Sequence, residues 1–139
     1  MATRMESGIV SHNAAELVAF YIDGLGFRER RVLRYPQGTV HRLVLESAEC
    51  KIFQPADAPQ PKPAHDSWSH FRGFAYAALH VDDAAAMFQR AVAAGASVIA
   101  EPYSPRPDAT VAIVADPHGN VLEILQEARQ TLSKEEEKS

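Results

Sequence analysis

Apolar positions along the chain recur with two spacings, one typical of helices and one of strands, and the same order of patterns occurs twice. Apolar residues follow helical spacing from Asn13 to Gly26 and again from Asp83 to Gly95. Asn and Asp accept hydrogen bonds from the first-turn amides of a helix, and Gly ends helices, so each pair predicts a complete helix. Short apolar segments predict strands at about 8–10, 27–34, 39–46, 49–54, 76–81, 97–100, 110–115 and 120–126.

The two halves of the chain are related by an internal repeat. Lys51 and Glu123 are the charged residues of two short apolar strands that both end on Gln. The helix starts, helix ends and final strands are all offset by about 70 residues, a constant period that indicates duplication. The sequence therefore predicts an α+β protein with two tandem βαβββ modules, at residues 5–54 and 73–126. A Pro-rich connector at 55–72 is expected to be extended, and the charged tail at 127–139 is expected to fray.

Composition narrows the partners and the compartment. The chain has a formal net charge of −4, and its longest basic block is Arg30-Arg31, so nucleic acid is an unfavourable partner. The single cysteine, Cys50, excludes an intrachain disulfide and is typical of a reducing compartment. Because no apolar run approaches the length of a membrane span and the start lacks the apolar stretch of a signal peptide, we expect a soluble, cytoplasmic protein with no membrane partner.

Three local motifs accompany the repeat: Phe20-Tyr21 on the first helix, Leu25-Gly26-Phe27 after it, and Asp116-Pro117-His118-Gly119-Asn120 before the last strand. With the paired modules, these motifs resemble the vicinal oxygen chelate superfamily. That group includes glyoxalase I, methylmalonyl-CoA epimerase, extradiol dioxygenases, fosfomycin-resistance enzymes and bleomycin-resistance proteins. The resemblance covers about residues 5–126 and implies a concave mixed sheet, but the shared fold does not fix the reaction.

The resemblance also implies where metal ligands would lie. Enzymes of the superfamily carry them on the first and last strand of each module, and here those positions hold Glu6, Lys51, Tyr76 and Glu123. Only the two glutamates are natural ligands of a divalent metal, because a protonated lysine has no free lone pair. We therefore expect no cofactor and a Glu6–Lys51–Glu123 ion-pair cluster with the Tyr76 hydroxyl as a further donor. Replacing Lys51 by Met or Ala should destabilise the fold or create a divalent-metal dependence. A divalent metal held by Glu6 and Glu123 remains the alternative.

Other residues are candidates for the walls of a binding cleft. Phe53 shares a strand face with Lys51, and Trp68, His80, Tyr103 and Arg106 are expected at the rim. Aromatic walls with a few polar groups suit a small, flat or amphipathic ligand. The same aromatics could instead bury a subunit interface, since the resemblance implies a homodimer.

Two classes of function follow. The first is a metal-free binding protein similar to the bleomycin-resistance proteins, which confer antibiotic resistance by sequestering a small molecule. The second is an enzyme of glyoxalase, epimerase or dioxygenase type. It would depend on a metal held by Glu6 and Glu123, or work without one through Lys51 and Tyr76, and its turnover would fail on Glu123→Gln. The catalytic candidates are then Lys51, Tyr76 and Glu123. His118 is interpreted as a turn residue, Cys50 is expected to face the helix side, and the face occupied by His41 is left open.

Overall fold

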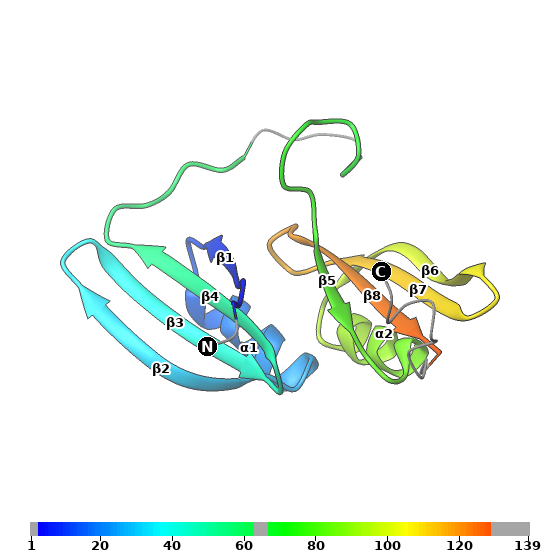
Figure 1. The fold of residues 1–139 in the computed structure, drawn as a ribbon. Coiled ribbons are helices and arrows are strands. Elements are labelled where there is room, and N and C mark those ends of the chain that lie inside the picture. The colour runs from blue at the N-terminus through cyan, green and yellow to red at the C-terminus, as the bar shows by residue number, and fades with distance from the viewer. Residues whose placement is uncertain (1–2, 63–66, 129–139) are drawn as a thin grey trace.

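The computed structural model describes residues 3–62 and 67–128, in which the chain forms two four-stranded sheets (Figure 1). The first sheet has the order β1-β4-β3-β2, and the second has the order β5-β8-β7-β6. In each sheet the first strand pairs in parallel with the last, and the other pairs are antiparallel. The prediction of an α+β fold with two βαβββ modules is confirmed. The elements of the first module are β1 (Ser7–Val10), α1 (Ala14–Ala19), η1 (Phe20–Gly24), β2 (Arg28–Tyr35), β3 (Gly38–Leu45) and β4 (Ala48–Pro55).

The second module repeats this order, and in Figure 1 the described parts of the connector lead away from the end of β4 and into β5. Residues 63–66 of the connector and 129–139 of the predicted tail lie outside the described residues. In the part of the chain that is described, no helix is long and apolar enough to cross a membrane. The elements of the second module are β5 (Ala77–His80), α2 (Ala84–Ala93), β6 (Ser97–Arg106), β7 (Ala109–Ala115) and β8 (Val121–Glu127).

At the start of each helix two side chains accept hydrogen bonds from backbone amides, and both contacts recur in the two modules. Asn13 Oδ1 accepts a hydrogen bond from the amide of Glu16 at 3.2 Å, and Asp83 Oδ1 accepts one from the amide of Ala86 at 3.0 Å. A glutamine at the penultimate position of the last strand of each module supplies the second contact. The Oε1 atom of Gln54 accepts from the Ala14 amide at 2.8 Å, and that of Gln126 accepts from the Ala84 amide at 2.9 Å. The repeated glutamines therefore tie each sheet to the first turn of its helix, whose amides lack partners within the helix.

Two elements differ from the sequence prediction. The first helix is α-helical only to Ala19 and continues as a π-helical turn over Phe20–Gly24. The strand predicted at 97–100 extends to Arg106, so the residues expected at the cleft rim, Tyr103 and Arg106, belong to this strand. Its two prolines are tolerated because β6 is an edge strand, where a missing N–H leaves no ladder bond unmade, and because its register is interrupted by bulges.

One hydrophobic core serves both modules and lies on the helix side of the sheets. The π-turn η1 contacts α2, and a Cβ added at Gly24 would lie 2.5 Å from the Ala94 Cβ, so glycine permits this close approach. Cys50 faces the core, as predicted. His41 lies opposite Ile52 on the same face, which resolves its orientation. The fully buried apolar side chains of the core include Leu17, Leu25, Leu43, Ile52, Val114 and Ile124.

Candidate functional site

Each sheet has a second face, opposite the helices, which we call the open face. Strand side chains alternate between faces, so Lys51 points to the open face because its neighbours Cys50 and Ile52 are buried in the core. Glu123 lies on the open face of the second sheet by the same argument, between the core residues Leu122 and Ile124.

The predicted pairing of Glu6 with Lys51 is present. The Lys51 Nζ atom lies 2.8 Å from the Glu6 Oε1 atom, and Arg42 on β3 approaches the other Glu6 oxygen at 3.6 Å. Hydrogen bonding to Lys51 lowers the pKa of Glu6 below its ordinary value, although partial burial opposes this shift. Sequence reasoning missed Arg42. The alternation of side chains along β3 places Arg42 on the open face. The antiparallel register places it directly opposite Lys51.

The remaining two members of the predicted cluster lie elsewhere in the chain. Glu123 lies next to Ala78 in the register of the second sheet and makes no ion pair with a described residue. Tyr76 immediately precedes β5 and packs edge-on against Trp68, with ring centroids 5.5 Å apart. A single chain therefore joins Glu6 to Lys51 and Arg42, and it does not bring Glu123 or Tyr76 into that ion-pair group.

The predicted cleft walls divide between the two open faces, except for Trp68, which lies on the connector. Phe53 shares the open face of the first sheet with Lys51. On the second sheet, the Arg106 guanidinium forms ion pairs with both Asp108 and Glu127, and the His80 Nδ1 atom lies 3.8 Å from Glu127. Tyr103 lies on the same open face, opposite Val111, and is about half exposed at 47%.

The four positions where the resemblance implies metal ligands do not offer a donor set for a metal ion. The carboxylate of Glu6 is occupied by an ammonium and faces a guanidinium, and neither cation has a lone pair to offer. Within residues 3–62 and 67–128, no group of three or more His, Cys, Asp or Glu side chains is arranged to hold a metal ion. The residues of one chain therefore do not fit a divalent metal at this position.

A polar junction between the modules was not foreseen. The ring of His118, interpreted from the sequence as a turn residue, bridges to the first module: its Nδ1 atom lies 3.2 Å from Ser11 Oγ and its Nε2 atom lies 3.1 Å from Glu16 Oε1. The His118 ring also stacks on His12 at 4.8 Å between centroids. The turn before the last strand thus fastens the second module to the start of α1.

A buried hydrogen bond lies beside this junction. The Tyr21 hydroxyl donates to the Asp116 carboxylate at 2.9 Å, and both side chains are 2% exposed. The carboxylate also accepts from the backbone amides of His118 and Asn120 and from the Asn120 side chain. Burial, reinforced by the nearby Asp116 charge, raises the pKa of Tyr21 well above its ordinary value of 10.0.

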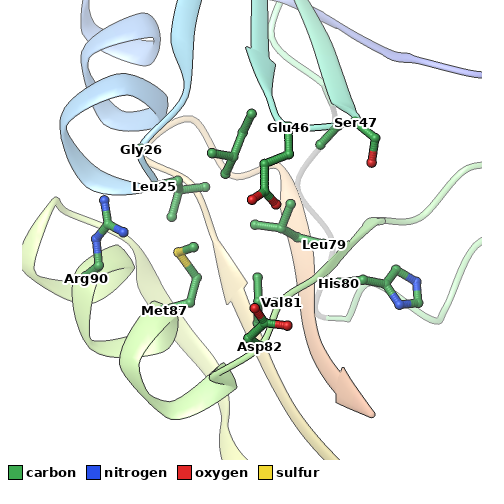
Figure 2. A pocket seen from close by; sticks show the side chains of 12 residues that line it. Leu25, Gly26, Glu46, Ser47, Leu79, His80, Val81, Asp82, Met87 and Arg90 are labelled. Carbon is green, nitrogen blue, oxygen red and sulfur yellow. The ribbon is translucent and has the colours of Figure 1, made fainter. Parts of the chain in front are cut away.

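A pocket of about 350 Å³ also lies between the modules. In Figure 2, Glu46 reaches from the β3–β4 turn over Leu79, whereas the His80 ring points away from the centre. Of the residues predicted for the cleft, only His80 lines this pocket, so it is distinct from the predicted cleft. The apolar residues of its lining are Leu25, Leu45, Ala48, Leu79, Val81 and Met87.

Comparisons with known proteins agree with this architecture. The model of the Glyoxalase/Bleomycin resistance protein/Dioxygenase superfamily matches residues 6–124. Glyoxalase I from Zea mays superposes with a TM-score of 0.72 at 18% identity, over 91% of this chain and 46% of that one. This chain thus spans just under half of the maize protein.

Two further solved structures match over nearly their whole length. The protein SMU.1112c has a TM-score of 0.70 at 25% identity, over 90% of this chain and 99% of its own. TioX from Micromonospora sp. ML1 has a TM-score of 0.66 at 15% identity, over 90% of this chain and 99% of its own. A search of curated proteins found no match. Similarities at these identities establish the fold, and function has to be argued from the residues.

Proposed function

Because the chain belongs to the glyoxalase/bleomycin resistance protein/dioxygenase superfamily, we propose that it binds a small aromatic or amphipathic molecule without a metal, in a cleft that two copies of the chain form with their open faces. The observation that carries this proposal is the 2.8 Å contact between Lys51 and Glu6. Both residues occupy positions where enzymes of the superfamily hold metal ligands.

The chemistry of lysine supports a metal-free site. A carboxylate in a cleft needs a counter-charge, which a metal supplies in the enzymes and which Lys51 supplies to Glu6 here. A divalent metal would have to displace the ammonium from Glu6 and also overcome repulsion from Arg42. Neither cation yields a lone pair near neutral pH. The group Glu6–Lys51–Arg42 then acts as a polar anchor beside the apolar residues of the same face.

The proposal of a shared cleft rests on the placement of the four superfamily positions. Glu6 and Lys51 lie on one sheet and Glu123 on the other, and no ion pair within the described residues joins the two sheets' open faces. A second copy could bring its Glu123 opposite the first copy's Lys51. Sequestration of a drug or metabolite, with antibiotic resistance as one outcome, would need no further chemistry.

An enzymatic alternative is favoured by one observation. Glu123 forms no ion pair with a described residue, so its carboxylate is available as a metal ligand or a base, with Lys51 and Tyr76 as the other candidates. An enzyme of glyoxalase, epimerase or dioxygenase type would lose turnover in the Glu123→Gln variant. A binding protein would show stoichiometric binding and no turnover to lose.

Metal content tests the proposal first. Mass spectrometry of tag-free protein, before and after chelation, is expected to find no stoichiometric divalent metal and an unchanged melting temperature. Near-stoichiometric metal that resists dialysis would overturn the metal-free site. The Lys51→Ala variant is expected to lose stability or gain a divalent-metal dependence. Arg42→Ala is the matched control, because it removes a cation beside the same carboxylate from a position where the superfamily has no ligand.

A further inference from the structure

The open face of the first sheet carries three cations in a single row. The strand register places Arg31 opposite Arg42 on β2 and β3, and Arg42 opposite Lys51 on β3 and β4. Directly opposed residues have Cβ atoms about 5 Å apart, so these three side chains, which we call the cationic row, span roughly 10 Å. Gly8 continues the row on β1, next to Lys51.

A row of apolar side chains runs beside it on the same face. Leu33 lies opposite Val40, Val40 lies opposite Phe53, and Phe53 lies beside Val10 on β1. These four residues, the apolar row, each lie two positions from the cationic row on their own strand and therefore point in the same direction as that row. Val10 is 59% exposed although it is a large apolar residue.

The cationic row has too few carboxylates to balance it. Glu6 pairs with both Lys51 and Arg42, and Arg31 forms no ion pair with a described residue. The next carboxylate on this face, Glu49, is already held by Arg4 and Arg30 at 3.2 and 3.1 Å.

Like charges directly opposite each other destabilise a sheet, so an arrangement with two positive charges in excess costs free energy unless an anion is bound. The row is also accessible. The Lys51 side chain is 45% exposed, and a Cβ added at Gly8 would meet no atom within 4 Å. Nothing in the described chain therefore covers this end of the row.

We propose that the open face of the first sheet binds a small organic anion, with its carboxylate, sulfonate or phosphate group on the cationic row and its flat apolar part on the apolar row. This inference rests on the proposed binding function and narrows its ligand to an anionic amphiphile. The guanidinium groups of Arg31 and Arg42 present planar donor forks that match such anions. The ring of Phe53 supplies the face on which a flat apolar group packs.

Two fluorescent probes that differ by one charge test the inference. Anilinonaphthalene sulfonate carries an anionic group, and N-phenylnaphthylamine has the same rings without it. We expect tighter binding of the sulfonate, and about fivefold weaker sulfonate binding in Arg31→Gln, which corresponds to about 1 kcal/mol. Binding of the neutral probe should not change. Phe53→Ala should weaken both probes.

Arg34→Gln is the matched control, because Arg34 is an exposed arginine on the same strand but lies opposite Thr39 on the other face. Equal sulfonate affinity in the Arg31 and Arg34 variants, with the neutral probe still bound, would overturn the anionic ligand and leave the proposed binding function intact. Failure of both probes to bind folded wild-type protein would overturn both. If Arg31→Gln weakened self-association in sedimentation and not sulfonate binding, the row would be covered by a second copy, which also overturns the inference.

Discussion

Replacing Tyr21 by Phe removes one hydroxyl from the junction between the modules and leaves the ring in place. The hydroxyl donates at 2.9 Å to the Asp116 carboxylate, and neither side chain is more than 2% exposed. Water cannot replace the lost donor without opening the core. Hydrogen bonds to charged groups contribute about 1.5–3 kcal/mol. Because Asp116 keeps its donors from His118 and Asn120, we expect a loss of about 2 kcal/mol, at the lower part of that range.

The loss is measurable by urea unfolding and by thermal denaturation. For a domain of this size, each kcal/mol corresponds to roughly 3 °C in Tm, so Tyr21→Phe should melt about 6 °C lower. The pH dependence supplies a second signature. The pKa of Tyr21 is raised in the folded state, so its contribution is complete below pH 10.0 and is lost as the pH rises above that value. The stability difference between wild type and Tyr21→Phe should therefore shrink in alkaline solution.

Tyr35→Phe is the control for this measurement. Tyr35 is 52% exposed at the end of β2, and its hydroxyl makes no hydrogen bond with a described residue, so its removal should change the free energy of unfolding little. A Tyr21→Phe protein within about 0.5 kcal/mol of wild type would refute the reasoning, because that is the range of ordinary surface substitutions.

Three other residues have separate expected outcomes. The pKa of Glu6 is lowered by Lys51, so the stabilisation by this pair should be present above pH 4.5 and be lost in more acidic solution; Glu6→Gln should abolish this acid dependence in pH-resolved melting, and a parallel wild-type curve would contradict it. Gln126→Ala leaves the first amide of α2 without its acceptor and should cost about 1 kcal/mol in urea unfolding, whereas no loss would mean that water replaces the contact. Burial raises the pKa of the Cys50 thiol, so a thiol reagent should label it slowly in native protein and rapidly in urea; rapid native labelling would show that β4 opens locally.

Sequence reasoning located the features that depend on interactions between residues close together in the chain. Asn13 and Asp83 were identified as caps because a cap is decided by a few neighbouring residues, and both caps are present. The repeat itself was visible in the spacing, but the role of its glutamines was not. Gln54 contacts an amide 40 residues away, and a pattern along the chain carries no information about such a distance.

The site was predicted less completely than the fold for the same reason. The pairing of Lys51 with Glu6 followed from the ligand positions that the family resemblance implies, whereas Arg42 required the register of β3 against β4. The extension of β6 to Arg106 was missed because proline usually ends a strand, and its position at the sheet edge together with the bulges in its register permits it. His118 was assigned to a turn, correctly for its backbone, but its ring contacts depend on how the modules pack together.

The alternation of side chains in the first sheet separates residues that pack the core from residues that determine what the surface binds. Cys50 and Ile52 pack in the core, while the next residue after each, Lys51 and Phe53, lies on the open face. A change in an outward residue alters what the surface recognises and leaves interior volume as it was. After duplication, the two halves could thus keep one shared interior and acquire unlike surfaces. Exchanging only outward residues between the halves would transfer recognition and spare the fold.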